Sequence, residues 1–120
     1  MKRSIKYLLL TQQVLEGIDD LVTRDVGSFV LVGKTRPLVI HELIGHKDYE
    51  IDAAMVEQLQ LFAAGLGAFR QGDWTRARKI FTRHLAVNNN DGVSRYYLNL
   101  CHHHQQPGDN WNGAIRLDTK

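Results

Sequence analysis

The sequence predicts an α+β protein in which a small βαββ piece is followed by three helices. Short runs of β-branched and aromatic residues, separated by a polar turn, occupy the N-terminal part and are typical of strands. From about residue 55 onwards, apolar residues recur every three or four positions, which is typical of amphipathic helices. We therefore expect a sheet piece over residues 1–46, packed against a helical module with a C-terminal tail over residues 47–120.

The N-terminal piece is expected to contain three strands and one short helix. Residues 7–10 form an apolar run that predicts a short buried strand, and Thr11 is placed to cap the brief helix that follows. Residues 22–32 and 37–43 predict two further strands, joined by a turn over residues 33–36. Together these elements make a β-hairpin preceded by a strand and a helix.

The next segment predicts a hairpin of two helices. The first helix carries one apolar stripe, formed by Met55, Leu59, Phe62, Leu66 and Phe69. Gly65 lies within this stripe. A glycine inside a helix costs about 1 kcal/mol relative to alanine, so its presence indicates that a neighbouring helix approaches the backbone there. We expect the small Ala77 of the second helix to face it.

The turn between these helices also has a recognisable pattern. Gly72 is expected to end the first helix in a left-handed conformation, and Asp73 to cap the second helix. The second helix carries Trp74, Ala77, Phe81 and Leu85 on one face. A third helix is expected over residues 91–104, with Val93, Tyr96, Tyr97, Leu100 and Cys101 inward.

The spacing of Gly65, Gly72, Asp73, Trp74, Ala77 and Phe81 resembles about one tetratricopeptide repeat. The sequence departs from the repeat at Leu61, His84 and Asn89. The resemblance implies a module that binds protein, because repeats normally stack on neighbours to bury a core. The residues expected to take part in such an interaction are Gly65, Phe69, Trp74, Tyr96 and Trp111.

Trp111 follows the Pro107-Gly108 pair that is expected to stop the third helix. An indole in such a polar segment is expected to pack into a groove, either on its own chain or on a partner copy. Residues 114–117 are expected to form a short extended tail.

The order of several short motifs resembles the C-terminal end of the catalytic domain of class III nucleotide cyclases. In this chain the motifs are Leu8 to Thr11, Thr23-Arg24-Asp25, Val32-Gly33-Lys34 with Pro37, and Val39 to Leu43. The helical part is similar to the helical tail of some of these cyclases. Its matching segments are residues 62–66, 73–74, 91–98 and 110–113.

The resemblance implies a chain without catalytic activity. Cyclases of this class hold two divalent ions on a pair of aspartates, and an Asn and Arg pair stabilises charge on the phosphorus. In the family these residues precede the region matched here, and Asp19, Asp20 and Asp25 do not occupy the corresponding setting. We therefore expect no catalytic residue, no metal and no cofactor. The resemblance assigns one contact to nucleotide phosphate, Lys34, which is otherwise a solvated lysine of the hairpin.

Other polar groupings have simpler interpretations. His102, His103 and His104 cannot all close on one metal ion, because consecutive helical residues point about 100° apart. His41 and His46 are expected on the surface. The Gly33-Lys34-Thr35 tripeptide lacks the remainder of a phosphate-binding loop, and the sequence supports no Ser/His/Asp or Cys/His arrangement.

Composition limits the partners further. The formal net charge is +2, and the basic residues Lys2, Arg3 and Lys6 form the one basic cluster singled out, so no nucleic-acid partner is expected. The single cysteine, Cys101, excludes an internal disulfide and fits a reducing compartment. The apolar run at residues 7–10 is far too short to span a membrane, and we expect a cytoplasmic protein.

The sequence thus supports two functional hypotheses. The first is a non-catalytic, cyclase-like association module that forms a homodimer or pairs with a class III cyclase. The alternative is a nucleotide-contacting subunit of a split class III cyclase that produces cyclic AMP, with Lys34 as the phosphate contact.

Overall fold

The structure is a computed structural model that describes residues 9–46, 51–103 and 111–117. The described residues form four strands and four helices, which confirms the α+β class. The chain divides into two compact units, a sheet unit of residues 1–51 and 115–120 and a helical unit of residues 52–114.

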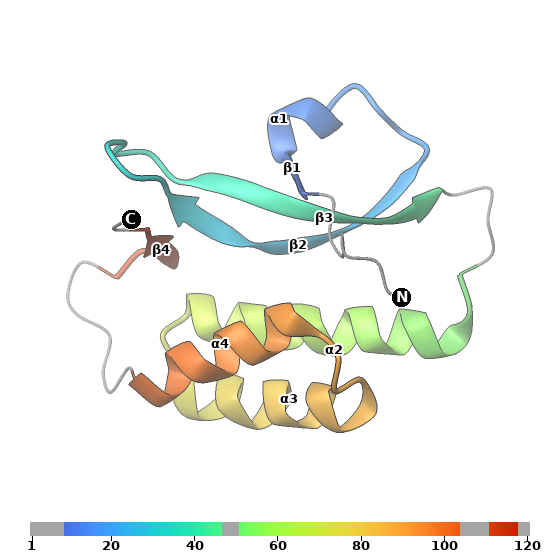
Figure 1. Ribbon diagram of the computed structural model, residues 1–120, viewed down its shortest axis with the longest axis vertical. Helices are drawn as coiled ribbons and strands as arrows, with labels where there is room; N and C mark the ends of the chain where they lie inside the picture. Colours follow the sequence, from blue (N-terminus) through green and yellow to red (C-terminus); the bar gives the residue numbers. More distant parts are fainter. Residues whose placement is uncertain (1–8, 47–50, 104–110, 118–120) are drawn as a thin grey trace, which may run out of the picture. The chain divides into compact units, whose positions relative to one another are not determined.

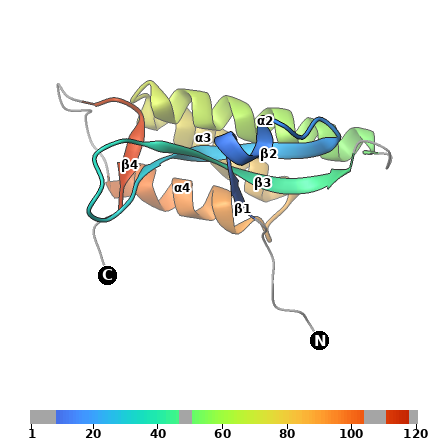
Figure 2. The ribbon, with the colours of Figure 1, turned by 90° about the horizontal axis from the view of Figure 1, so that it is seen from above.

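The sheet unit is built around one long antiparallel hairpin (Figures 1 and 2). Its strands and helix are β1 (Leu9–Thr11), α1 (Gln12–Leu15), β2 (Leu21–Val30), β3 (Leu38–His46) and β4 (Ala114–Arg116). The strand order is β1-β3-β2-β4. The pairing of β2 with β3 begins at Leu21 opposite His46 and ends at Phe29 opposite Leu38. Both long strands are therefore paired over nearly their whole length.

The connection between β2 and β3 spans residues 31–37, so it begins two residues before the predicted turn over residues 33–36 and ends one residue after it. The backbone N–H of Lys34 donates to the carbonyl of Leu31 at 3.0 Å, and Gly33 has a φ of +80°, a conformation that glycine adopts readily. This turn takes Leu31 and Val32 out of β2, although both are apolar, and leaves them exposed. At its other end β3 continues to His46, three residues beyond the predicted end.

The first strand and the C-terminal tail also differ from expectation. Leu9 in β1 is 54% exposed, so this strand is not buried. Thr11 does cap α1 as predicted, since its hydroxyl accepts a hydrogen bond from the N–H of Val14. The tail forms β4 beside β2, where the Leu117 N–H donates to the Val30 carbonyl at 2.9 Å. The tail therefore belongs to the sheet unit and not to the helical module.

The helical unit contains α2 (Ala53–Arg70), α3 (Trp74–Val87) and α4 (Gly92–His103), which run in alternating directions (Figure 1). Gly72 ends α2 with a φ of +79°, as predicted. Its N–H donates to the Phe69 carbonyl at 2.9 Å, and the Asp73 N–H donates to the Ala68 carbonyl at 3.0 Å. This pair of bonds is the Schellman arrangement that satisfies the last carbonyls of a helix.

The cap of the next helix is also confirmed. The Asp73 carboxylate accepts a hydrogen bond from the Arg76 N–H at 3.1 Å. This bond satisfies one of the free amides at the start of α3. The sharp reversal from α2 into α3 thus follows from residues adjacent in the sequence.

An aromatic core holds the three helices together. Phe62 and Phe69 come from α2, Phe81 from α3 and Tyr97 from α4, and all four are nearly fully buried. The ring of Tyr97 stacks on Phe81 with centroids 5.4 Å apart and packs edge-on against Phe69 at 4.9 Å. Phe81, and not Ala77, supplies the atoms nearest to Gly65. Ala77 is itself fully buried.

Candidate functional site

A buried ion pair joins the two long strands of the sheet unit. Arg24 of β2 is paired with Glu42 of β3, and its guanidinium contacts the Glu42 carboxylate through Nε at 2.9 Å and through a terminal nitrogen. Their side chains are 9% and 11% exposed. A slip of one residue would separate these buried charges, so the pair helps to define the register of the hairpin. The Glu42 carboxylate is held in this ion pair, so it is not free to act as a catalytic acid.

Lys34 lies in the turn between β2 and β3. Its side chain is exposed and has no ion-pair partner among the described residues. The neighbouring residues Gly33, Thr35 and Arg36 are also exposed. A flexible ammonium supplies a single point charge, and it does not enclose a phosphate group by itself.

The two histidines of β3 are half-buried and bonded, and do not simply decorate the surface as expected. His46 Nε2 lies 3.0 Å from Asp20 Oδ2. His41 Nδ1 lies 3.3 Å from Thr23 Oγ1. His41 and Glu42 have different partners, in agreement with the alternation of side chains along a strand.

Metal-binding side chains do not gather in the described part of the chain. Over residues 9–46, 51–103 and 111–117, no three His, Cys, Asp or Glu side chains come together in a group that could hold a metal ion. His102 and His103 are exposed at the end of α4. His104, the third residue of the predicted histidine run, lies outside the described residues.

Trp111 docks on the helical unit of its own chain. Its indole Nε1–H donates to the Arg70 carbonyl at 2.8 Å. Its ring packs edge-on against Trp74 and Phe69, with centroids 5.0 Å and 5.5 Å away. Phe69 and Trp74 are buried, as is Gly65, so these residues belong to the core of the unit. The buried side chains of Phe69 and Trp74 are therefore not available to contact a partner.

Tyr96 and Tyr97 are placed differently from each other. Both were expected to point inward, but Tyr96 is 39% exposed and Tyr97 is 1% exposed. Adjacent residues on a helix cannot share one narrow face, because each residue turns the side-chain direction by about 100°. Burial raises the pKa of the Tyr96 hydroxyl above its usual value.

The structure brings together a serine, a histidine and an aspartate that the sequence analysis did not connect. Ser94 Oγ donates to Asp91 Oδ2 at 2.7 Å and lies 3.1 Å from His84 Nδ1. Because the hydroxyl gives its one hydrogen to Asp91, Nδ1 of His84 must carry the hydrogen in its bond to Ser94. His84 is then not a base for Ser94.

Burial also argues against catalysis by this group. Ser94, His84 and Asp91 are 0%, 1% and 6% exposed, so substrate has no access to the hydroxyl. The three side chains satisfy one another between the end of α3 and the start of α4. The arrangement stabilises the helical unit.

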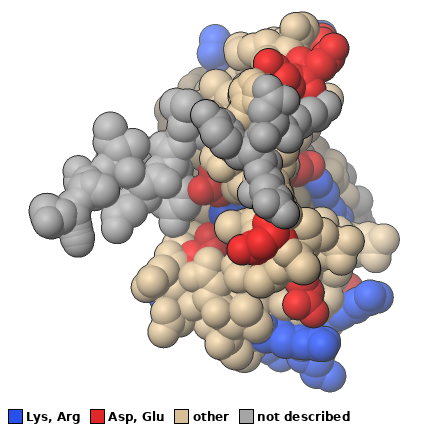
Figure 3. Space-filling model, turned by 90° about the vertical axis from the view of Figure 1, so that its right-hand side faces the viewer, with Lys and Arg blue, Asp and Glu red and all other residues tan. Residues whose placement is uncertain are grey.

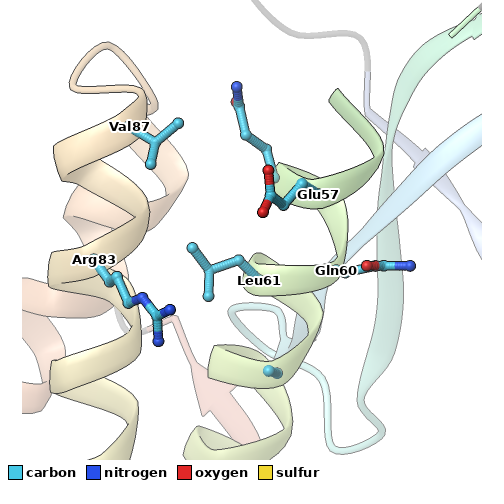
Figure 4. Close-up of a pocket in the computed structure, with 7 residues that line it drawn as sticks. Glu57, Gln60, Leu61, Arg83 and Val87 are labelled. Atoms are coloured by element: carbon cyan, nitrogen blue, oxygen red, sulfur yellow. The ribbon is translucent and has the colours of Figure 1, made fainter. Parts of the chain in front are cut away.

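A groove lies between α2 and α3 on the surface of the helical unit. Its volume is about 380 Å³, and its lining residues are Glu57, Gln58, Gln60, Leu61, Ala64, Arg83 and Val87. Figure 4 shows Leu61 projecting from α2 towards α3, and Arg83 and Val87 projecting from α3 towards α2. The groove thus has an apolar centre and charged residues at its rim.

The groove residues occupy a different face of α2 from the core residues. Phe62, Gly65 and Leu66 are buried, whereas Ala64 is exposed and Leu61 is half-buried. Val87 on the opposite wall is 63% exposed. Sequence reasoning missed this surface because it followed the buried stripe alone.

Comparisons with protein-family models, with curated proteins and with solved structures gave no match. The resemblances to class III cyclases and to tetratricopeptide repeats therefore stay predictions. In the described part of the chain, none of the helices has the length and apolar character needed to cross a membrane.

Proposed function

We propose that this chain is a non-catalytic, cyclase-like association module whose helical unit binds another protein, either a second copy or a class III cyclase. The observation that carries the proposal is the groove between α2 and α3. Protein interfaces commonly combine an apolar centre with a polar rim. Leu61, Ala64 and Val87 supply such a centre here, and Glu57 and Arg83 lie at the rim.

Two sequence features support the cyclase-like part of the proposal. The motifs at residues 23–25 and 39–43 resemble the end of a cyclase catalytic domain, and the residues that hold metal in that family precede the matched region. The matched segments themselves include none of the family's metal-binding residues, so we assign these segments a role in association. Its single cysteine fits the reducing interior of a cell.

The proposal is tested by two measurements on the full chain. Sedimentation velocity over a range of concentrations tests whether the chain associates with itself. The second measurement adds increasing amounts of the chain to a candidate class III cyclase and follows the production of cyclic nucleotide. We expect self-association in the first measurement or a dose-dependent change in the second. Val87→Asp places a charge in the groove and should weaken either effect. Val32→Asp is a matched control, because Val32 and Val87 are 64% and 63% exposed. A monomer at every concentration, together with unchanged cyclase activity, would contradict the proposal.

The alternative function is a nucleotide-contacting subunit of a split cyclase. It is favoured by the exposure of Lys34, whose ammonium has no ion-pair partner among the described residues. Lys34→Ala distinguishes the two functions in an equilibrium nucleotide-binding assay. If the chain is a nucleotide-contacting subunit, the variant should bind nucleotide more weakly. If the chain is an association module, its nucleotide affinity should not change. Arg36→Ala is the control for loss of an exposed positive charge in the same turn.

A further inference from the structure

One wall of the groove belongs to a strongly basic helix. α3 contains four basic residues, Arg76, Arg78, Lys79 and Arg83, and no acidic residue. Arg76, Lys79 and Arg83 are exposed. Residues three, four and seven positions apart lie on the same side of a helix, so these cations form one stripe along α3. Figure 3 shows Lys and Arg side chains gathered at the bottom of the view, and α3 is the lowest helix of the helical unit in Figure 1.

The positive charges of this stripe are not neutralised within the described part of the chain. None of Arg76, Lys79 and Arg83 has an ion-pair partner among the described residues. By contrast, the buried Arg24 is paired with Glu42. A stripe of exposed cations attracts negative charge from solution, and it does so more strongly at low ionic strength.

The wall formed by α2 has a different character. Gln58 and Gln60 are neutral, and Glu57 is the one charged residue that α2 contributes to the groove. Glu57 lies at the end of the groove nearest Val87, as Figure 4 shows. Among the residues that line the groove, α3 contributes the cation Arg83 and α2 contributes the anion Glu57. Lys79 and Arg76 continue the basic stripe along α3 beyond the lining residues.

We infer that the groove binds an acidic, amphipathic helical segment of a partner protein, and this inference rests on the proposed function. Aliphatic side chains on one face of the segment occupy the space among Leu61, Ala64 and Val87. Acidic side chains on its flank contact the stripe on α3. This is the helix-in-groove mode of recognition, in which residues at three- and four-residue intervals supply the apolar anchors.

The charges also specify a direction for the bound helix. The N-terminus of a helix carries partial positive charge and its C-terminus partial negative charge. Glu57 therefore favours the N-terminus of the segment at the Val87 end of the groove. Arg83 lies farther from that end, and Lys79 and Arg76 continue the stripe beyond it along α3. These cations favour the C-terminus of the segment on that side, so the segment lies antiparallel to α3.

A peptide fits the groove better than a nucleic acid does. Single strands are bound chiefly through aromatic side chains on which bases stack, and none of the described residues that line the groove is aromatic. A second copy of the chain is a poorer fit to the groove. Placed groove to groove, the two copies would bring their basic stripes of Arg76, Lys79 and Arg83 together, and like charges repel.

The experiment uses the full chain and three fluorescein-labelled synthetic peptides. Each has about 15 residues, a length at which isolated helices are marginally stable, and leucines at three- and four-residue intervals. The first carries glutamates in its C-terminal half, the second carries them in its N-terminal half, and the third has lysines in place of the glutamates. Fluorescence anisotropy measures each affinity, and circular dichroism compares the helicity of the free peptides.

The first peptide is expected to bind about tenfold more tightly than the other two, a difference of about 1.4 kcal/mol. Added salt should reduce this difference, because the charges are exposed. Arg83→Glu should lower affinity for the first peptide and raise it for the third. Arg36→Glu, an equally large charge change at an exposed residue of the hairpin turn, should leave both affinities unchanged.

Several results would overturn the inference. Equal binding of the three peptides would exclude recognition of an acidic helix, and preference for the second peptide would exclude the assigned direction. Displacement of the peptide by duplex DNA at lower concentration would assign the stripe to nucleic acid. If the chain associates with itself or changes cyclase activity, and Arg83→Glu leaves that association intact, the proposed function stands and its assignment to this groove fails.

Discussion

The ring of Phe81 occupies the space that a side chain at Gly65 would need. A Cβ atom added to Gly65 would lie 2.8 Å from Phe81 Cε1 and 3.0 Å from Cζ. The ring has little freedom to move, because it stacks on Tyr97 and also packs against Phe62 at 5.6 Å. Close contact between α2 and α3 therefore depends on the absence of a side chain at Gly65.

Gly65→Ala is expected to destabilise the protein although alanine favours helix. The new methyl group would push the Phe81 ring against a filled core, and overpacking of this kind typically costs about 1–3 kcal/mol. Gly67→Ala is a control in the same helix, because a Cβ at Gly67 meets no atom within 4 Å. That change should stabilise the protein by up to about 1 kcal/mol.

Urea unfolding followed by far-ultraviolet circular dichroism measures both changes. A further variant, Gly65→Ala with Phe81→Leu, should be less destabilised than the sum of its two single changes, because the smaller side chain makes room for the methyl group. Equal stabilities of Gly65→Ala and Gly67→Ala would contradict the close contact.

Arg24→Met is expected to destabilise the protein by about 3–5 kcal/mol, because it leaves the buried carboxylate of Glu42 without its cation. Arg24→Met combined with Glu42→Leu should recover much of the loss, since both charges are then removed. The free energy of unfolding in urea gives both values. If the double variant is no more stable than Arg24→Met, the pair is not the source of the effect.

Cys101 predicts a dependence of stability on alkaline pH. Burial raises the pKa of its thiol from 9.0 to about 11, an effect that the charge of Arg78 partly opposes. The unfolded chain ionises this thiol first, so the stabilising effect is complete below pH 9 and is lost as the pH rises to about 11. The wild type should therefore lose more unfolding free energy over this range than Cys101→Ala does. Parallel pH profiles of the two proteins would contradict the prediction.

Trp111 provides a test of docking within the chain. Trp111→Phe removes the hydrogen bond to the Arg70 carbonyl and keeps an aromatic ring, so a loss of about 1 kcal/mol is expected. Trp111→Ala also removes the ring contacts with Phe69 and Trp74, which adds about 1–3 kcal/mol for two aromatic pairs. Thermal unfolding ranks the two variants. Wild-type stability in Trp111→Ala would show that the indole does not stabilise the fold.

Local sequence patterns predicted the helical hairpin well. The conformation of Gly72 and the cap formed by Asp73 depend on residues within one turn, so their signals are complete in a short stretch of sequence. The turn of the sheet was predicted to begin two residues too late, because Leu31 and Val32 have strand-like side chains. There, the hydrogen bond between Lys34 and Leu31 outweighs strand propensity.

The candidate site was harder to predict. The spacing of Arg76, Lys79 and Arg83 was a signal for a basic stripe that the sequence analysis did not use, since it singled out the residues near the N-terminus instead. The absence of partners for these cations depends on where every described carboxylate lies. Such information is not contained in helical spacing.

The sequence by itself determined the α+β class, the helical hairpin with its caps, and the close approach of a second helix at Gly65. These features depend on periodicity and on neighbouring residues. The tertiary structure decided that Phe81 is the neighbour of Gly65, that the C-terminal tail joins β2, and that Trp111 packs on its own helices. It also brought Leu61 and Arg83 to opposite walls of one groove. Each of these relationships joins residues far apart along the chain, and only folding brings such residues into contact.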